Sequence, residues 1–522
     1  MADILKLASP YWVNMFDNPP VDFDDTEEYE YVEYLEAQAG GSAPDVNQSI
    51  FRLYNRDIDP YLYFHKGVIQ IRGYIATDAN IGTYFNGSVN TGEISLCNLG
   101  QYAIFSKAEL RLENTLIQKL DNPRHIAQVK SLVRFCDDNV RSQGTLTFFY
   151  KDTGTGDADN EKYNTVPYLD VNIDIDKVQG DLADQTVDDP PAQANIQTVV
   201  DNIVVRLNAQ QYRIPGDTAF GTNESNTYNQ GFADRHKRCI AQSGATKKVF
   251  EMYLPLAYLF DFYDSNRFPF RGLKHEILLY KESNKANFLH RNDATVNGQF
   301  VFDKISLWVP RMKPSLERMA DLDAKFAEGA MTTLRWTDYD WFISPTVPAA
   351  NRNYNWRVTA SQGRPSKAYV FYQLAATVNG NQTTNKMIFN NLTNEGAGGI
   401  NTVEMRINSH VFPRETLTLN FTDDQEDYLR AYLMLLESQG KMLAEDTGLM
   451  ISYEEFKTLY TLFVFDFTKI ERRIYENISS AEVEVRWTLR DSAEGDYICF
   501  CILESEKQAT MRAVDQKLLI SL

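Results

Sequence analysis

A strand-like segment that leads into a helix-like segment occurs twice in this chain, 295 residues apart. Residues 108–117, AELRLENTLI, align with residues 403–412, VEMRINSHVF. Apolar and polar residues alternate in both segments, and each is followed by a stretch in which apolar residues recur at helical spacing. One repeat of this length predicts two copies of a domain rather than a solenoid of short units.

The first copy shows the change of period clearly. Ala108, Leu110 and Leu112 alternate with charged residues, as a half-buried strand requires. Pro123 then opens a predicted helix, because proline fits the first helical turn, and apolar residues keep helical spacing through Val133. The sequence therefore predicts a strand followed by a helix.

The second copy repeats this order between residues 403 and 440. Asp423 is placed to cap a helix, and Glu426 is placed to complete a capping box. Gly440 suits the end of that helix. The predicted apolar stripe, which we expect to pack against its own domain, consists of Tyr428, Leu429, Tyr432, Leu433 and Leu436.

Strand-like segments separated by long polar loops dominate the rest of the chain. Tyr (29 residues) and Phe (30 residues) are abundant, which favours strands. A parallel α/β fold needs a helix after nearly every strand, and that rhythm is absent. The length of 522 residues suits two cores. We therefore predict an all-β fold of two tandem eight-stranded jelly rolls, each with an inserted helix-bearing loop.

The same patterns predict how the chain is divided. We expect an acidic N-terminal arm at 1–47, a first jelly roll at 48–313 with a long insert at about 152–235, a linker helix at 314–329, and a second jelly roll at 330–522. The insert is polar and rich in turn residues, a composition typical of functional loops.

The arm is strongly acidic, with ten Asp or Glu against one Lys through residue 40. The simpler interpretation is a solvated, weakly ordered tail. The alternative is an extended segment that becomes ordered on a partner surface, with Tyr29, Tyr31 and Tyr34 as anchors.

The whole chain has a formal net charge of −19 and five irregularly spaced cysteines. Phosphate binding needs clustered Lys and Arg, so we expect no direct nucleic-acid binding. The odd cysteine count argues against a disulfide framework and suits a reducing compartment. The N-terminus has no basic leader followed by an apolar core, and no apolar run approaches the length of a membrane span. We therefore expect no signal peptide.

No catalytic or metal-binding motif emerges from the sequence. His236 and Cys239 lie three residues apart in HKRC, but two possible ligands do not make a site. Residues 157–161, DADNE, resemble the start of a calcium loop, yet Lys162 and Tyr168 stand where Gly and Glu are needed. Neither a nucleophile elbow nor a phosphate-binding loop is present. We predict no catalytic, cofactor-binding or metal-ligating residue and expect a protein that is not an enzyme.

Four blocks of the second half resemble the major capsid proteins of Polinton/Maverick elements and adintoviruses, relatives of the virophage and adenovirus lineage. The blocks are VEMRINSHVFPRETLTLNF, DDQEDYLRAYLMLLESQGKM, YTLFVFDFT and AEVEVRWTLRDSAEGDYICFCILES. The positions that match the family pattern are Tyr428, Arg430, Tyr432, Leu462, Phe463, Phe465, Asp466 and Thr468.

The first half resembles the family in the same order, through FSKAELRLENTLIQ, KKVFEMYLPLAYLFDF, GLKHEILLYKE and FDKISLWVPRMKPS. The first helix, NPRHIAQVKSLVRF, departs from the Tyr-x-Tyr-Arg opening that is usual in the family. The acidic arm and the insert have no counterpart that we can place.

The resemblance implies a double jelly-roll capsid protein of a DNA virus, whose homotrimers form pseudo-hexameric capsomers that tile an icosahedral shell. The implied partners are the chain itself, neighbouring capsomers and a minor or penton capsid protein, inside a host cell and then in the virion. We expect Arg430 at the trimer interface, the insert at the outer face or over a neighbour, and the arm tied to the shell interior or an adjacent capsomer. Two alternatives remain: a tandem β-sandwich that binds or processes carbohydrate, and a domesticated or minor capsid component that builds no shell.

Overall fold

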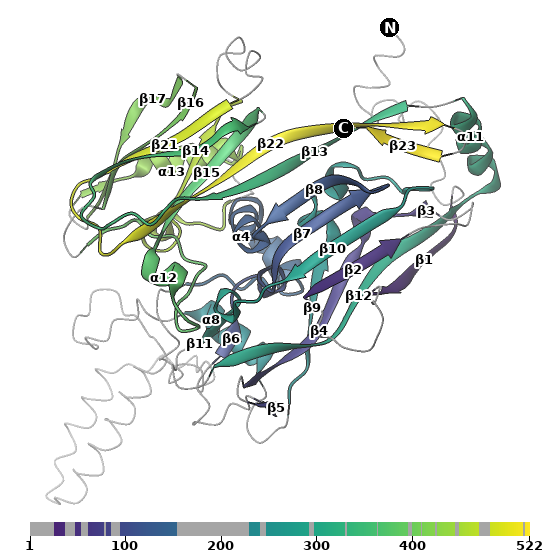
Figure 1. Ribbon diagram of the computed structural model, residues 1–522, viewed down its shortest axis with the longest axis horizontal. Coiled ribbons are helices and arrows are strands. Elements are labelled where there is room, and N and C mark those ends of the chain that lie inside the picture. The colour runs from purple at the N-terminus through teal and green to yellow at the C-terminus, as the bar shows by residue number, and fades with distance from the viewer. Residues whose placement is uncertain are drawn as a thin grey trace, which may run out of the picture.

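The computed structural model describes most of the chain, and within these residues it forms two β-rich lobes that meet in the middle (Figure 1). The described residues are 26–36, 47–53, 61–77, 80–84, 94–153, 229–240, 247–291, 297–328, 331–362, 364–394, 399–408, 410–422, 425–443, 448–468, 481–514 and 517–521.

Two antiparallel sheets build the first lobe. The first sheet contains β1 (Thr26–Leu35), β12 (Gly298–Pro314), β4 (Val68–Thr77) and β9 (Phe250–Pro255), with the short β3 (Tyr61–Leu62) and β5 (Asn80–Tyr84) beside them. The second sheet contains β2 (Gln48–Leu53), β10 (His275–Lys281), β7 (Phe105–Leu112) and β8 (Thr115–Asp121), in that order. A small separate pair is formed by β6 (Ile94–Leu96) and β11 (Leu289–Arg291).

The second lobe has the same plan. Its first sheet contains β13 (Met331–Ile343), β22 (Tyr497–Val514), β15 (Pro365–Leu374) and β20 (Leu462–Asp466), with β23 (Lys517–Ser521) paired to β22. Its second sheet contains β14 (Asn353–Gln362), β21 (Ala481–Leu489), β16 (Ile400–Ile407) and β17 (His410–Thr418), in that order. A small pair follows, β18 (Asn420–Thr422) with β19 (Gln425–Asp427).

The order in which the chain visits the two sheets identifies both lobes as jelly rolls. Each lobe has eight main strands. In chain order, they belong to the first sheet, the second, the first, the second, the second, the first, the second and the first. Two four-stranded sheets connected in this way form a jelly roll, and here the pattern occurs twice. The predicted fold class, two tandem eight-stranded jelly rolls, is confirmed.

The repeat seen in the sequence is the hairpin formed by the middle strands of each jelly roll. The strands β7 and β16 begin at Phe105 and Ile400, which preserves the offset of 295 residues. The turns correspond as well, because Glu113 (φ 48°) and Asn408 (φ 54°) both adopt the left-handed conformation. The repeated phrase is therefore a structural repeat and not a chance similarity.

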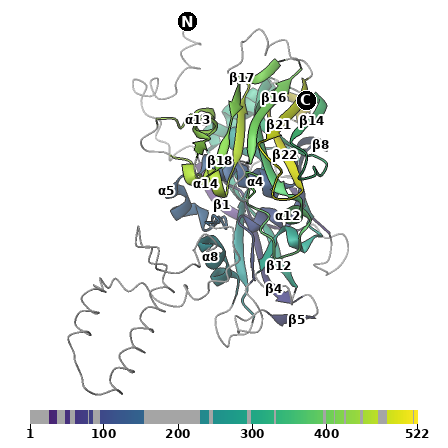
Figure 2. The ribbon, with the colours of Figure 1, turned by 90° about the vertical axis from the view of Figure 1, so that its left-hand side faces the viewer.

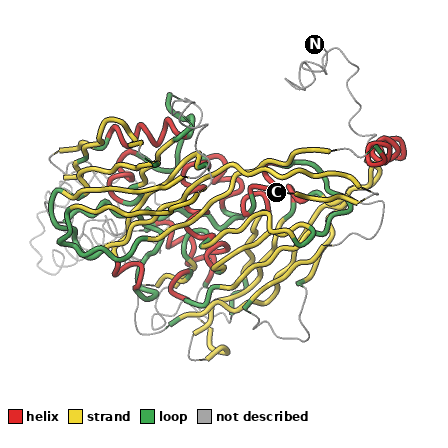
Figure 3. The backbone as a smooth tube through the Cα atoms, turned by 45° about the horizontal axis from the view of Figure 1, so that its top comes forward, coloured by secondary structure: helices red, strands yellow, loops and turns green. Residues whose placement is uncertain are grey.

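Helices occupy the connections between the strands, and many of them lie between the two lobes (Figure 3). Those of the first lobe are α3 (Gly100–Ala103), α4 (Pro123–Arg134), α5 (Asp137–Asn139), α8 (Gln230–Cys239), α9 (Leu256–Leu259) and α10 (Asp261–Ser265), with the short turns η1 (Phe64–Lys66), η2 (Val140–Gly144) and η5 (Lys285–Asn287). The linker helix is α11 (Leu316–Ala327). The second lobe has α12 (Ala375–Asn379), α13 (Leu429–Ser438) and α14 (Tyr453–Thr458).

Both long helices occupy the same connection of their jelly rolls. Helix α4 follows the hairpin strand β8 and precedes β9, whereas α13 follows β17 and precedes β20. Pro123 starts α4, as its position in the sequence indicated. Each jelly roll therefore has the helix-bearing loop that was predicted.

Part of the acidic arm belongs to the first jelly roll, which corrects both interpretations of the arm for these residues. The strand β1 pairs with β12 from Thr26, opposite Pro314, to Leu35, opposite Ser306. Tyr34 packs against the apolar core, so the Glu/Tyr alternation belongs to an edge strand. Residues 1–25 and 37–46 of the arm lie outside the described residues. The other segment bounds remain predictions.

The start of the second long helix also differs from the prediction. Glu426 lies in strand β19, and α13 begins only at Leu429, after Tyr428. Asp423 lies outside the described residues. The predicted apolar stripe is divided, because Tyr428 is buried whereas Leu429 is 53% exposed. Gly440 follows the helix with φ 65°, as predicted.

Candidate functional site: the junction between the two lobes

Helix α4 lies at the centre of the molecule and is buried on every side. Its residues from Pro123 through Val133 are all buried, although the helix belongs to a loop of the first lobe (Figure 1). A helix without a solvent-facing side must pack between two partners. Figure 2, a view along the long axis, shows α4 in the interior and α13 at the periphery.

His125 is the main contact of α4 with the second lobe. Its ring lies 5.1 Å from Phe500, 5.5 Å from Phe371 and 6.2 Å from Trp341, measured between ring centroids. Burial lowers the pKa of His125 well below its ordinary value, and the neighbouring cation Arg124 acts in the same direction. His125 is therefore a neutral packing residue at the junction.

Asp261 anchors a buried charge network around the other end of α4. Its carboxylate, 3% exposed, lies 2.6 Å from Nζ of Lys130 and 3.0 Å from Nη1 of Arg134. Arg134 also donates a hydrogen bond to the Tyr339 hydroxyl on β13 of the second lobe. Burial lowers the pKa of Lys130, whereas for Arg134 burial is outweighed by Tyr339 and Asp261, which raise its pKa. The network ties α4 to α10 and to the second lobe.

A second buried cluster closes the base of the long insert. Nη2 of Arg235 lies 2.5 Å from Oδ1 of Asp152, and both side chains are fully buried. Asn229 donates to the same oxygen at 2.7 Å, and the Tyr460 hydroxyl of the second lobe donates to the Asp152 carbonyl at 2.8 Å. Residues 154–228, between Asp152 and Asn229, lie outside the described part of the chain. The two ends of the insert therefore meet at one buried point.

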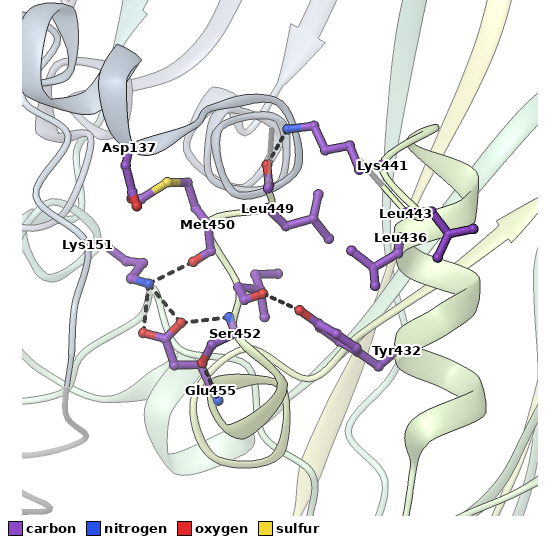
Figure 4. A pocket seen from close by; sticks show the side chains of 12 residues that line it. Asp137, Lys151, Tyr432, Leu436, Lys441, Leu443, Leu449, Met450, Ser452 and Glu455 are labelled. Carbon is purple, nitrogen blue, oxygen red and sulfur yellow. Dashed lines mark hydrogen bonds and ion pairs between the residues drawn. The ribbon is translucent and has the colours of Figure 1, made fainter. Parts of the chain in front are cut away.

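A pocket of about 500 Å³ lies where the helix-bearing loops of the two lobes meet (Figure 4). Nζ of Lys151 lies 2.7 Å from Oε1 of Glu455 and donates to the Met450 carbonyl at 2.7 Å. Glu455 and Ser452 form the capping box of α14, with hydrogen bonds of 2.9 Å and 3.2 Å. Glu455, Lys151 and Ser452 are thus all engaged in structural interactions, as expected where two parts of a fold are held together.

His236 and Cys239, which were considered as metal ligands in the sequence, make local packing contacts. Nδ1 of His236 lies 2.8 Å from the Ile94 carbonyl oxygen, and its ring stacks on Phe232. Cys239 is 1% exposed, and burial raises the pKa of its thiol to about 12. Among the described residues, no three His, Cys, Asp or Glu side chains come together in a way that could hold a metal ion. Residues 157–161 lie outside the described stretches.

The residues predicted to make contacts between chains lie on the surface. Arg430 is 49% exposed, and its guanidinium lies 3.5 Å from the exposed carboxylate of Glu415. Tyr29 and Tyr31 are 46% and 49% exposed and meet edge to face, with ring centroids 6.0 Å apart. The structure does not bring Arg430 and the two tyrosines together, because they belong to different lobes.

The buried charged residues of the junction were not predicted from the sequence. Lys130 and Arg134 are four residues apart, so they share one side of α4, and this spacing was the available signal. Nothing in the sequence indicated that Asp261, more than a hundred residues later, would be their partner. Among the described helices, none combines the length and apolar character needed to cross a membrane.

Two jelly rolls in tandem around one buried junction define a double jelly-roll protein. The chain belongs to the double jelly roll-like domain family, which matches residues 223–507. The resemblance seen in the sequence is thereby confirmed at the level of this fold. No curated protein matches the chain.

A solved viral structure has the same fold, and others match with lower scores. The cryo-electron-microscopy structure of the Sputnik virophage matches with a TM-score of 0.55 and 10% identity, over 95% of this chain and 89% of that chain. The mavirus major capsid protein gives a TM-score of 0.46 and 11% identity, over 98% and 95%. The Faustovirus major capsid protein gives 0.46 and 10%, over 95% and 90%. At such identities the likeness concerns the fold alone.

Proposed function

We propose that this chain is the major capsid protein of a DNA virus of the Polinton, virophage and adenovirus lineage. The observation that carries this proposal is the pair of topologically identical jelly rolls held together by a buried junction. A structural role agrees with the pocket at the junction, where the polar groups named above are all used for internal contacts.

In the proposed assembly, three chains contribute two jelly rolls each to a pseudo-hexameric capsomer, and capsomers tile an icosahedral shell. A repeated unit favours this arrangement, because a contact made once within the chain can be made again between chains with nearly the same geometry. The proposed partners are other copies of the chain, neighbouring capsomers and a minor or penton capsid protein. The proposed location is the virion, after assembly in the host cell.

The net negative charge of the chain supports a role in a shell that encloses the genome without binding it directly. A net charge of −19 opposes the counterion release on which non-specific nucleic-acid binding depends. The insert between Asp152 and Asn229 is proposed to lie at the outer face or over a neighbouring subunit, and the residues before β1 to contact the shell interior or an adjacent capsomer.

Light scattering during size-exclusion chromatography tests the oligomeric state. We expect a particle of three times 59.8 kDa, and electron microscopy of the same fraction should show pseudo-hexagonal capsomers. A monomer that binds glycans would instead support the tandem β-sandwich alternative. Trimers that never form shells, alone or with a co-expressed minor capsid protein, would support a domesticated homologue.

A further inference from the structure

Helix α13 has a second apolar side that the described residues of its own jelly roll leave partly exposed. At 100° per residue, Leu429, Leu433 and Leu436 lie on one side of the helix, away from the buried Ala431 and Leu435. Leu429 is 53% exposed, and Leu433 and Leu436 are half-buried. We call these three leucines the outer leucine stripe.

The apolar surface continues beyond the end of the helix. Met442 is 44% exposed and Leu443 is 91% exposed, and Leu443 lies beside Leu436 at the rim of the pocket (Figure 4). Exposed large aliphatic side chains clustered in this way are typical of a surface that another protein covers.

Among the described residues, the outer side of the first sheet of the first lobe carries two partly exposed tyrosines, and Lys66 lies over one of them, Tyr29. Because Tyr34 points into the core, Tyr29 and Tyr31 point outward from β1. They pair with Met312 and Pro310 on β12. Nearly half of each tyrosine side chain is exposed, although neither residue lies in a loop.

The second jelly roll shows what covers this side of the sheet. Its first strand, β13, also carries two aromatic residues at alternate positions, Tyr339 and Trp341, as β1 carries Tyr29 and Tyr31. Helix α4 of the first lobe covers them: Arg134 bonds to the Tyr339 hydroxyl, and His125 packs on Trp341. Tyr339 is only 2% exposed as a result.

The two surfaces lie on different lobes of the molecule. In Figure 1, β1 lies at the right-hand end, whereas α13 belongs to the left-hand lobe. One copy cannot satisfy both surfaces by itself. A surface on one lobe that fits a different surface on the other lobe makes a head-to-tail contact, and such contacts form a ring when the rotation between copies closes.

We propose that the outer leucine stripe of α13 packs on the Tyr29/Tyr31 side of β1 in a second copy of this chain, repeating between chains the contact of α4 with β13. This inference rests on the proposed trimer and names the surfaces that build it. Charge is compatible with the same pairing, since β1 carries four glutamates between residues 27 and 33, two of which, Glu27 and Glu33, pair with Lys313 and Lys304. Arg430, beside the stripe, pairs with the exposed Glu415.

Two double variants test the proposal by light scattering. One variant combines Leu429→Asp and Leu443→Asp, and the other combines Tyr29→Glu and Tyr31→Glu. All four side chains are exposed, so each variant should keep its circular dichroism spectrum while the particle mass falls from three chains to one. Leu116→Asp, a substitution of the same kind at a residue 42% exposed on β8 within the first lobe, is the matched control and should remain trimeric.

Mixing the two variants tests the direction of the contact. Each variant keeps the surface that the other has lost, so the mixture should form dimers through one intact junction but no closed trimers. Dimer formation also shows that both variants are folded. A mixture that stays monomeric, or a variant that stays trimeric, overturns the head-to-tail pairing.

The outcomes separate this inference from the proposed function. A wild-type chain that is monomeric contradicts the trimer itself. Wild-type trimers whose variants also remain trimeric contradict only the pairing of α13 with β1.

Discussion

The two jelly rolls have the same eight strands in the same order, yet they differ in what covers them. In the first lobe, the helix of the inserted loop, α4, is completely buried, and it covers the first strand of the second lobe. In the second lobe, the equivalent helix α13 keeps three leucines turned outward, and β1 has no comparable cover within the described residues. The difference indicates that one inter-roll contact is made within the chain and the other is left for a partner.

The largest expected effect concerns the first strand itself. Deleting residues 1–47 removes β1 and leaves β12 as an unpaired edge, so the first lobe should lose its cooperative unfolding and the protein should aggregate. Deleting only residues 1–25 keeps β1 and should leave the melting transition and the trimer intact while shell assembly is impaired. Calorimetry and light scattering compare the two. A fully stable 1–47 deletion would contradict the place of β1 in the fold.

Asp261→Asn should be the most damaging single substitution at the junction. It leaves the buried Lys130 and the adjacent Arg134 without their counter-charge, at a cost of about 3–5 kcal/mol in the free energy of unfolding. Glu415→Gln removes the exposed partner of Arg430 in the second lobe and should cost below about 1 kcal/mol. Chemical denaturation measures both. Equal effects would mean that the two lobes do not differ in this respect.

Truncating one leucine in each helix sharpens the comparison. Leu132→Ala creates a cavity in α4, where the side chain is fully buried, and should cost about 2–5 kcal/mol at any protein concentration. Leu429→Ala should change the stability of the isolated chain by less than about 0.5 kcal/mol. If a second copy covers Leu429, its effect should grow with protein concentration. A concentration-independent loss at Leu429 would argue for contacts within the chain.

The last expected effect concerns pH. Burial lowers the pKa of His275 to about 3, whereas an unfolded histidine titrates near 6.5. Between these values the unfolded chain binds a proton that the folded chain does not, so stability falls as the pH drops below about 6.5.

The size of this loss is about 1.4 kcal/mol per pH unit for one histidine. His275→Gln keeps an acceptor for the Tyr263 hydroxyl and should remove that part of the slope, while the contribution of the buried His125 remains. Urea denaturation between pH 7 and pH 4.5 measures it. His410→Gln, at an exposed residue of the second lobe, is the control, and an unchanged slope in His275→Gln would contradict the expectation.

The repeat could be predicted from the sequence, because a hairpin is a local structure. Its strands show an alternation of period two in consecutive residues, such as Ala108 to Leu112. It was not sufficient for β1. Glutamates that alternate with tyrosines are compatible with a solvated tail and with an edge strand, and only pairing with β12, almost three hundred residues away, decides between them. Edge strands with charged side chains are common in natural sheets.

The helix boundaries and the partners of the buried charges could not be predicted from the sequence for a related reason. A carboxylate before an apolar run resembles a helix cap, but Glu426 is held in a two-stranded pair with β18. The pairing of Asp261 with Lys130 and Arg134 depends on how α10 and α4 are brought together, which is a property of the tertiary fold. The outward turn of Leu429 likewise depends on which side of α13 its own jelly roll covers.

The buried contact of Arg235 with Asp152 and Asn229 has a consequence for how this protein can change over time. It holds both ends of the insert at one place, next to the core. Doubling the length of a loop whose ends are already held costs only about 0.6 kcal/mol of chain entropy. We therefore expect this position to serve as a grafting point, where foreign epitopes or binding peptides can be inserted between two chain ends that the core already holds together.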